Sequence, residues 1–279
     1  MSQKRSENTY QKINTIFKRD NKNVIMQYAG FVQPEFEYLR NLKWRGEEKI
    51  DGTNMRIEVV PKIEYVVDTV NNIEYEETNE ILGVHFTVTI KGKTDNAQIP
   101  LALKTYMEKN YPQDKVFESL GLKEYIPVEE WIDHKWNSAI DIPTYTIYGE
   151  GYGEKIQKAG PHYIKVGVSF RVFDVKVNNI YLRTESRDDI ANKLGAPIVP
   201  LIGYFTLDEA IEYVRNGFKS IIAEDKDFIA EGLVLRTDLG LRNRMGERLI
   251  VKIKYEDFQK YRNVYGTDEP VEQIPNSNY

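Results

Sequence analysis

The sequence predicts an α+β protein with a core of antiparallel sheets flanked by helices. Residues 146–153, 169–175 and 249–254 read as strands, because they alternate in polarity or are rich in β-branched and aromatic residues. Other stretches carry the start and stop signals of helices. The chain has 279 residues, of which 41% are hydrophobic, and this is ample for a substantial core. We expect a single domain over residues 1–279.

The clearest predicted helix covers residues 207–215. Thr206 precedes it and Glu209 follows three positions later, which is the spacing of a capping box. Gly217 stands just past its end, where glycine commonly terminates a helix.

Two further helices are predicted from similar signals. Ser186 and Asp189 have the capping spacing and predict the start of a helix that ends at Gly195. Pro100 opens a helix over residues 101–110, since proline is favoured at the beginning of a helix.

The composition excludes several classes of protein. No apolar run is long enough to cross a membrane, and the N-terminal residues lack the apolar segment of a signal peptide. The chain has no cysteine, which excludes disulfides and thiolate metal sites. We expect a cytoplasmic protein, in the host cytoplasm if its origin is viral. The net charge of −5 argues against a general polyanion binder, so nucleic-acid contact requires a local patch.

Two clusters of basic residues are candidates for such a patch. The first lies near the start of the chain and comprises Lys12, Lys18, Arg19 and Lys22. The second lies in a connection where a hairpin would project beside Lys252 and Lys254, and it comprises Arg242, Arg244 and Arg248. A solvated charged turn is the alternative for the second cluster.

Lys49 is the most informative residue of the sequence. It stands in the run Glu48-Lys49-Ile50-Asp51-Gly52-Thr53-Asn54, two residues before a turn-forming Asp-Gly pair. A lysine amine at such a place is a candidate nucleophile, provided that it loses its proton. An ordinary exposed turn is the alternative.

Glu150 is the one carboxylate in the glycine-rich end of residues 146–153. The glycines suggest a phosphate-binding loop, but no Gly-Lys-Ser or Gly-Lys-Thr follows, and the dinucleotide-binding spacing is absent. Both kinds of nucleotide-binding loop are therefore excluded.

Three charged positions follow near the end of the chain. Glu231 stands before Gly232 at the start of an apolar strand, where the glycine leaves room for a ligand. Lys252 and Lys254 share one face of the strand over residues 249–254. Two neighbouring cations on a buried face are costly unless an anion lies between them. A solvated strand face is the alternative.

These segments resemble, in order and approximate spacing, the motifs of the covalent nucleotidyltransferase superfamily of ATP-dependent DNA ligases, RNA ligases and mRNA capping enzymes. The resemblance covers most of the chain and implies a nucleotidyltransferase core, the adenylation core of ligases, in which Lys49 is the nucleophile. The other implied roles are ribose binding by Glu150, purine stacking by Phe173, metal binding by Glu231 and α-phosphate binding by Lys252 and Lys254.

Further positions join the predicted site through the same resemblance. Asp51 is a carboxylate near the attacking amine. Phe170 is the fallback for Phe173, and either ring could instead be a core residue, as is usual for phenylalanine in a strand. The remaining predicted nucleotide-binding positions are Glu48, Ile50, Asn54 and Lys93.

The run Gly52-Thr53-Asn54 indicates the RNA ligase 2 type, because DNA ligases and capping enzymes usually carry arginine where this chain has Asn54. That branch has an arginine near residues 91–95, where this chain has none, and Lys93 is the best alignment to it. A lysine offers a phosphate one charge but no bidentate pair of donors. Residues 57–90 are longer than the matching segment of the branch and are interpreted as an inserted β-hairpin.

The resemblance implies an ATP-dependent RNA ligase that uses Mg²⁺ or Mn²⁺. It would join 3′-hydroxyl and 5′-phosphate RNA ends through lysyl-AMP and an adenylylated 5′ end. After Lys254 only 25 residues remain (279 − 254), so residues 255–279 are interpreted as a short tail without the OB-fold of DNA ligases. Either the core binds and joins RNA unaided, or an accessory protein or RNA structure supplies further contacts that hold the RNA.

Two alternatives stay open at this point. One is a DNA ligase or a capping-type nucleotidyltransferase core. The other is a non-catalytic relative that binds nucleic acid.

Overall fold

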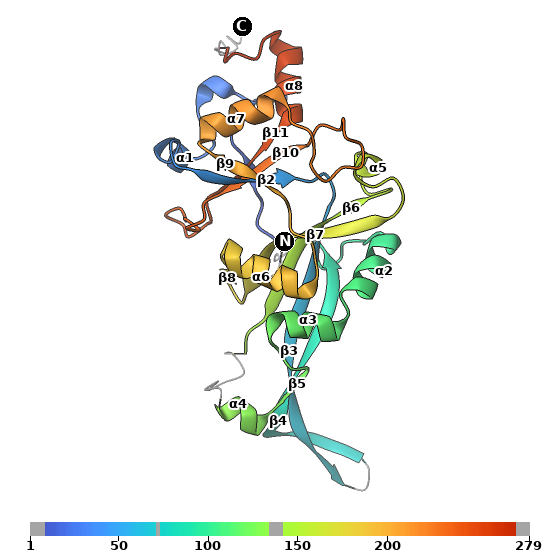
Figure 1. The fold of residues 1–279 in the computed structure, drawn as a ribbon. Coiled ribbons are helices and arrows are strands. Elements are labelled where there is room, and N and C mark those ends of the chain that lie inside the picture. Colours follow the sequence, from blue (N-terminus) through green and yellow to red (C-terminus); the bar gives the residue numbers. More distant parts are fainter. Residues whose placement is uncertain (1–8, 71–72, 134–141, 272–279) are drawn as a thin grey trace. The chain divides into compact units, whose positions relative to one another are not determined.

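The computed structural model describes residues 9–70, 73–133 and 142–271. The chain divides into two compact units (Figure 1). The first unit is built from residues up to 10, 53–152 and 167–198, and the second from the rest. Each unit has a sheet rich in antiparallel pairs, accompanied by helices, so the predicted α+β fold is confirmed. The prediction of one domain stays a prediction, since compactness alone does not show that either unit folds by itself.

The second unit is built on a five-stranded sheet with the order β1-β11-β10-β2-β9. β1 pairs in parallel with β11, whereas the other neighbours are antiparallel. The strands are β1 (Asn14–Thr15), β2 (Trp44–Lys49), β9 (Leu201–Phe205), β10 (Gly232–Arg236) and β11 (Ile250–Lys254). Segments far apart in the sequence therefore lie side by side, as β2 in blue and β10 in orange show in Figure 1.

The helices of the second unit are η1 (Gln27–Ala29), α1 (Pro34–Tyr38), α5 (Gly160–Tyr163), α7 (Leu207–Asn216) and α8 (Tyr255–Tyr265). α7 and α8 contact each other and β11. Their apolar residues form one core cluster with Leu233, Val251 and Ile253. Because side chains alternate along a strand, Lys252 and Lys254 point to the opposite face of the sheet from this core.

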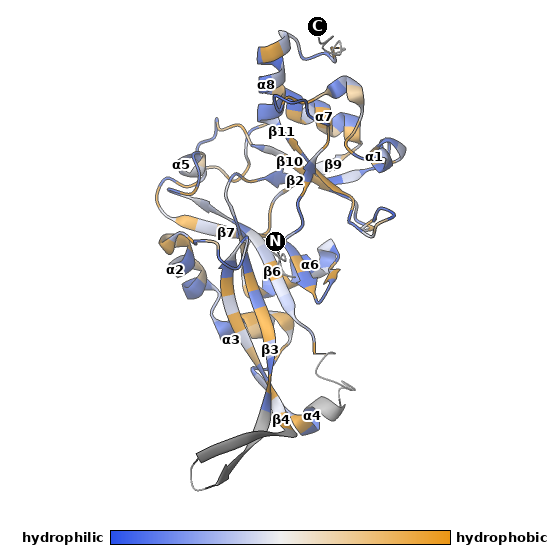
Figure 2. Ribbon diagram, turned by 180° about the vertical axis from the view of Figure 1, so that it is seen from behind, coloured by the Kyte–Doolittle hydropathy of each residue, from blue (hydrophilic) through white to orange (hydrophobic). Residues whose placement is uncertain are grey.

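The first unit is built on a six-stranded sheet with the order β5-β4-β3-β6-β7-β8. Its strands are β3 (Thr53–Val70), β4 (Ile73–Gly92), β5 (Tyr125–Pro127), β6 (Tyr145–Gly153), β7 (Val168–Val177) and β8 (Ile180–Tyr181). Its helices are α2 (Leu101–Asn110), α3 (Gln113–Leu120), α4 (Val128–Asp133) and α6 (Thr184–Leu194). Ile57, Ile147 and Val172 are fully buried in this unit, and Figure 2 shows hydrophobic and hydrophilic residues mixed along its strands.

β3 and β4 form one long antiparallel hairpin. Met55 lies opposite Gly92 at its base, and Val70 lies opposite Ile73 at its tip. The hairpin includes the described part of the stretch 57–90, for which the sequence predicted this structure. That the hairpin is an insertion stays a prediction.

The capping-box helix is confirmed as α7. The Glu209 backbone N–H donates to Thr206 Oγ1, and the Thr206 backbone N–H donates to the Glu209 carboxylate at 2.7 Å. The helix ends before Gly217, whose φ of 75° favours glycine. Pro100 precedes α2, as predicted.

The predicted start of the next helix at Ser186 is wrong. α6 begins at Thr184, and no side chain caps it. Arg187 in its first turn is buried and donates to the carbonyl of Phe173, a contact between elements that outweighs the local capping signal. The predicted end at Gly195 is confirmed, with φ of 69°. Residues 255–279, predicted as a tail, begin with α8.

Candidate active site

The register of the five-stranded sheet brings Lys49 to Glu231. Gly232 on β10 lies opposite Lys49 on β2 and opposite Lys254 on β11. Both lysines therefore flank the residue that follows Glu231. Lys49 Nζ lies 2.5 Å from one Glu231 carboxylate oxygen, and Lys254 Nζ lies 3.1 Å from the other.

Gly232 is required at the centre of this arrangement. Its φ is 152°, and a Cβ atom here would lie 1.9 Å from the carbonyl oxygen of Ile253. Only glycine lets β11 approach β10 this closely. Gly232, which was predicted to leave room for a ligand, therefore has a packing role between the strands.

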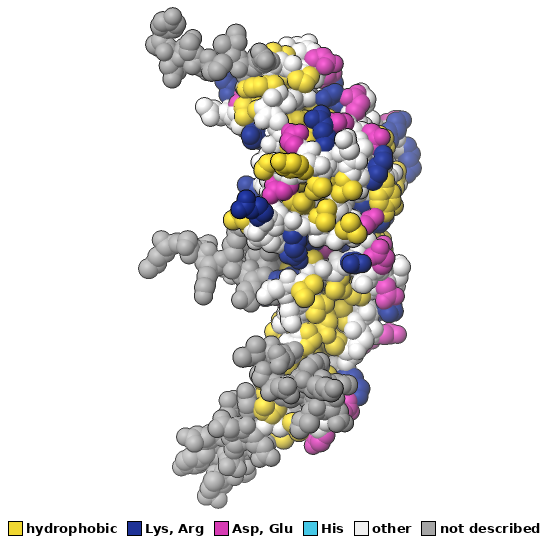
Figure 3. Space-filling view, turned by 90° about the vertical axis from the view of Figure 1, so that its left-hand side faces the viewer, with side chains coloured by type: hydrophobic (Ala, Val, Ile, Leu, Met, Phe, Trp, Pro, Cys, Tyr) yellow, Lys and Arg dark blue, Asp and Glu magenta, His cyan; other side chains and the backbone are white. Residues whose placement is uncertain are grey.

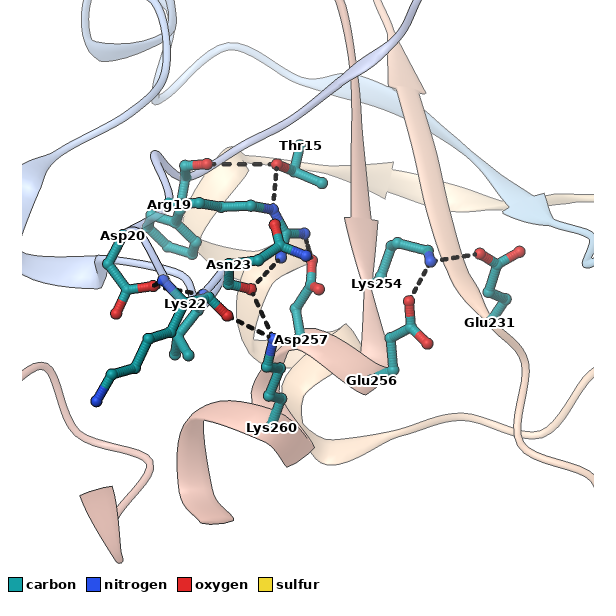
Figure 4. A network of polar contacts seen from close by, with 12 residues as sticks. Thr15, Arg19, Asp20, Lys22, Asn23, Glu231, Lys254, Glu256, Asp257 and Lys260 are labelled. Atoms are coloured by element: carbon teal, nitrogen blue, oxygen red, sulfur yellow. Dashed lines mark hydrogen bonds and ion pairs between the residues drawn. The ribbon is translucent and has the colours of Figure 1, made fainter. Parts of the chain in front are cut away.

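Lys254 is held as a cation between two carboxylates. Its amine contacts Glu231 and also Glu256 at the start of α8 (Figure 4). Burial disfavours the ammonium, but the hydrogen bonds to Glu256 and Glu231 outweigh burial, so the pKa of Lys254 is raised. The pKa of Glu256 is lowered in turn, chiefly by the hydrogen bond from Lys254.

Lys252 has the opposite electrostatic surroundings. Among the described residues, none forms an ion pair or a side-chain hydrogen bond with its amine. Burial disfavours its charge, and Lys49 and Lys254 repel it, so the pKa of Lys252 is lowered. A bound anion would offset both effects, because a nearby opposite charge favours the ammonium form.

The turn after Lys49 is fixed by a buried tyrosine. The backbone N–H of Asp51 donates to Tyr163 Oη over 3.1 Å, and Tyr163 is fully buried. Burial and the charge of Glu231 raise the pKa of the Asp51 carboxyl, whereas Lys49 opposes them. Asp51 therefore lies in the electrostatic field of the same cluster. Nothing in the sequence marks Tyr163 as its partner, because 112 residues separate the two.

Glu48 faces away from this cluster. Its side chain is only 2% exposed and accepts hydrogen bonds from Ser220 Oγ at 2.5 Å and from the Ile221 backbone N–H at 3.1 Å. The Glu48 carboxylate thus anchors β2 to the segment before β10. Ile50, the next predicted position, is also buried.

Glu47 is a second buried anchor of β2. Its carboxylate is 1% exposed and lies 3.1 Å from both Arg45 and Arg236. A buried carboxylate is tolerated when it is paired in this way. Neither Ser220 nor Arg236 stands out in the sequence, because each acts through a partner distant in the chain.

Two predicted positions are neighbours in the first unit. Asn54 on β3 pairs with Glu150 on β6. The Oδ1 atom of Asn54 is buried and has no hydrogen-bond partner among the described residues. Buried acceptors are normally satisfied, so this oxygen is available to a ligand or a water molecule.

The two candidate phenylalanines of β7 differ in their surroundings. Phe170 is fully buried, and its ring lies against Gly149, where a Cβ atom would come within 2.3 Å of it. Phe173 is partly exposed and contacts Tyr10 edge-on, with 4.9 Å between ring centroids. Phe170 is therefore a core residue, and Phe173 is the available ring.

Lys93 is exposed after the end of β4. An arginine at the base of this loop, Arg56, is fully buried and donates to the carbonyl of Gly92 at 2.5 Å and to Glu58 at 2.6 Å. Lys91 pairs with Glu58 at 2.7 Å. These contacts hold the base of the loop and leave Lys93 as its exposed cation.

The placement predicted for the second basic cluster, beside Lys252 and Lys254, is wrong for Lys254. The cluster, Arg242, Arg244 and Arg248, lies in the connection from β10 to β11. Because the strands are antiparallel, this connection meets β11 at Ile250, whereas Lys254 lies at the other end. At a rise of about 3.3 Å per residue, that end is about 13 Å away. The connection therefore does not project beside Lys254.

A family model described as RNA ligase matches residues 42–254, which is more than half of the chain. The match includes Lys49, Glu231 and Lys254. The chain belongs to the RNA ligase family. No curated protein sequence matches this member of the family.

Solved structures show the same fold for this RNA ligase family member. A mutant of Naegleria gruberi RNA ligase with AMP and Mn matches with a TM-score of 0.53 and 14% identity, over 95% of this chain and 60% of that one. Another mutant, with ATP and Mn, matches with a TM-score of 0.51 and 16% identity, over the same shares. The chain spans about 60% of the length of these RNA ligase chains.

Within the part of the chain that the structure describes, no helix is long and apolar enough to cross a membrane.

Proposed function

We propose that this protein is an ATP-dependent RNA ligase that joins a 3′-hydroxyl and a 5′-phosphate RNA end through lysyl-AMP. One observation carries the proposal: Lys49 and Lys254 converge on the carboxylate of Glu231. Lys252 stands on the same face of β11 with a lowered pKa and no described ion-pair partner. A nucleophile, a carboxylate and cations for a phosphate are the groups that nucleotidyl transfer needs.

In the first proposed step, Lys49 attacks the α-phosphorus of ATP. Its ammonium leaves the ion pair with Glu231 and loses a proton to solvent, because only the neutral amine has a lone pair. A bond forms between Nζ and the α-phosphorus, and Nζ gives up a second proton to solvent as the phosphoramidate forms. The bond from that phosphorus to the bridging oxygen breaks, and pyrophosphate leaves with this oxygen. Lys252 and Lys254 neutralise the charge on the α-phosphate.

Glu231 is the proposed ligand of Mg²⁺ or Mn²⁺. No group of three or more His, Asp or Glu side chains in the described residues could hold a metal ion by itself. A single carboxylate fits Mg²⁺, which commonly keeps waters and binds through one or two carboxylates plus substrate phosphates. Such an ion would supply charge neutralisation to the triphosphate.

The other predicted positions have supporting roles in the proposal. Asp51 orients the amine, and the backbone of Glu48 and Ile50 lines the nucleotide while the Glu48 side chain anchors the strand. Asn54 offers its buried oxygen to the nucleotide. The remaining proposed contacts are ribose to Glu150, purine to Phe173 and a terminal phosphate to Lys93.

Two further steps complete the proposed reaction. An oxygen of the 5′-phosphate of an RNA end attacks the phosphorus of lysyl-AMP. The bond from that phosphorus to Nζ breaks, and Lys49 leaves as an amine that takes up a proton from solvent. A 3′-hydroxyl then attacks the 5′-phosphate, AMP leaves, and a phosphodiester bond remains. An accessory protein or structure in the RNA itself would supply any further contacts needed to hold the RNA ends.

The first experiment is self-labelling of the pure protein with magnesium and ATP labelled on the α-phosphate. We expect label that survives denaturing electrophoresis on the wild type, and none on Lys49→Ala. Lys62→Ala is the matched control, because Lys62 is an exposed lysine of β3 outside the proposed site. A wild type that is free of bound AMP and takes no label would contradict the proposal.

A second comparison separates the proposal from a DNA ligase or capping core. The same labelling is run with GTP, and sealing is then compared on nicked RNA and nicked DNA. Preference for GTP indicates a capping-type core, and equal sealing of nicked DNA indicates a DNA ligase.

A further inference from the structure

A basic groove lies beside Lys252 and Lys254 within the second unit. Its volume is about 720 Å³. Six cations and two anions line it, together with polar residues of β1 and its flanks. The cations are Lys12, Lys18, Arg19, Lys252, Lys254 and Lys260, and the anions are Glu256 and Asp257.

Both anions of the groove are already engaged. Asp257 pairs with Arg19 at 2.6 Å, and Glu256 contacts Lys254 (Figure 4). The amine of Lys260 donates to two backbone carbonyls, at 2.9 and 3.1 Å. The charged side chains in this part of the groove therefore already have partners within the protein.

Three cations of the groove have no such partner. Lys12, Lys18 and Lys252 form no ion pair or side-chain hydrogen bond with any residue that the structure describes. Lys12 and Lys18 are exposed, whereas Lys252 is half-buried. Because the whole chain carries a net charge of −5, three unpaired cations in one concave surface are a local excess of positive charge.

The parallel pairing of β1 with β11 creates this arrangement. Thr15 lies opposite Lys252, and the backbone N–H of Ile16 donates to the carbonyl of Lys252 at 3.1 Å. Lys12 lies just before β1 and Lys18 just after it, so the N-terminal segment carries both lysines alongside Lys252.

We propose that this groove binds the sugar–phosphate backbone of an RNA strand, with Lys12 and Lys18 contacting phosphates beside the α-phosphate that Lys252 binds. The proposal rests on the proposed function, because it places the polynucleotide next to the reacting phosphate. At about 30 Å³ per water molecule, the groove has room for about 24 waters. A pyrophosphate would leave most of that space empty, whereas several nucleotides would fill it.

The chemistry of the lining favours phosphates over bases. Lysine amines bind phosphate oxygens without reading sequence. Binding at this groove is therefore independent of sequence and weakens with salt, because each phosphate that is neutralised releases counterions.

The test compares two double variants that remove the same charge. Lys12→Ala/Lys18→Ala removes the exposed lysines of the groove, and Lys62→Ala/Lys109→Ala removes two exposed lysines of the first unit. Binding of a 5′-phosphorylated single-stranded RNA is measured by fluorescence anisotropy at several salt concentrations. For the groove variant, we expect Kd to rise about tenfold or more. We also expect the slope of log affinity against log salt to become shallower by about 1.4, or about 0.7 per phosphate. The control variant should match the wild type.

Three outcomes decide the matter. Equal RNA affinity of the two double variants overturns the proposal. Loss of lysyl-AMP formation with RNA binding retained also overturns it, and assigns the groove to the triphosphate. A groove variant that loses RNA binding, from a wild type that binds RNA but takes no AMP label, supports the groove while contradicting the proposed function. Lys12→Arg/Lys18→Arg keeps the charge and should restore binding, which separates charge loss from misfolding.

Discussion

Lys252 and Lys254 are neighbours on one strand face, yet the folded protein lowers the pKa of Lys252 and raises that of Lys254. The charge of Lys252 is disfavoured by burial and by two other lysines, whereas that of Lys254 is favoured by two carboxylates. We expect Lys252→Met to raise the Tm by about 2 °C and Lys254→Met to lower it by a similar amount. Each variant should lose lysyl-AMP formation by about 100-fold or more. Thermal unfolding and α-phosphate labelling check both expectations.

The effect of Lys252 on stability depends on pH in a defined direction. Its folded pKa lies below the unfolded value, so the cost of its charge is fully present at neutral pH. That cost falls as the pH rises through the folded pKa towards the ordinary value of 10.5. The Tm advantage of Lys252→Met should therefore shrink at alkaline pH, and an advantage that grew there would contradict this account.

Asp51 gives the corresponding prediction on the acid side. Its folded pKa is raised by burial and by Glu231, so its ionised form costs stability at neutral pH. As the pH falls through the folded pKa towards the ordinary value of 3.8, the folded state takes up its proton first and the cost disappears. We expect Asp51→Asn to raise the Tm at about pH 7 and to have no effect below the ordinary pKa. A Tm difference independent of pH would show that charge is not the cause.

At the residue scale, the sequence predicted which charged residues come together but not the residues that hold them in place. Lys49, Glu231 and Lys254 each stand in a short motif, and the structure brings them together. Tyr163 and Ser220 could not be found in the same way. Their contribution is one hydrogen bond each to a residue more than a hundred positions away, and no local pattern records such a contact.

Among the elements, β10 depends most on a single residue. Gly232 has a positive φ and almost touches the Ile253 carbonyl, so Gly232→Ala meets both backbone strain and a clash. We expect this change to cost about 2–4 kcal/mol, or about 5–10 °C in Tm. Gly240→Ala is the matched control, since Gly240 also has a positive φ of 62° but open space around it. Thermal unfolding of both variants separates the clash from the strain, and equal losses would contradict the clash.

Element boundaries followed from the sequence only where local signals decide them. The capping box of α7 and the proline before α2 are local, and both are confirmed. The start of α6 is set instead by the contact of Arg187 with β7, and the sequence signal at Ser186 was misleading. The turn with Arg242 was misplaced with respect to Lys254, because its position depends on strand direction, which residue composition does not reveal.

At the scale of the whole molecule, the net charge does not reveal where cationic side chains are grouped on the surface. The net charge of −5 and the mixture of charges on the face drawn in Figure 3 give no sign of a polyanion-binding protein. The groove along β1 nevertheless contains three lysines that have no ion-pair partner among the described residues. The division into two units was also hidden from the sequence, since each unit is assembled from separate stretches of chain and no linker marks the crossings.

The edges of the five-stranded sheet also bear on how the protein behaves when concentrated. β1 has only two residues, and the pairing of β9 with β2 is irregular between Gly46 and Glu47. Short or bulged edges present few unpaired backbone groups to another chain. A neighbouring copy therefore finds little on which to add a strand, which works against sheet-mediated aggregation.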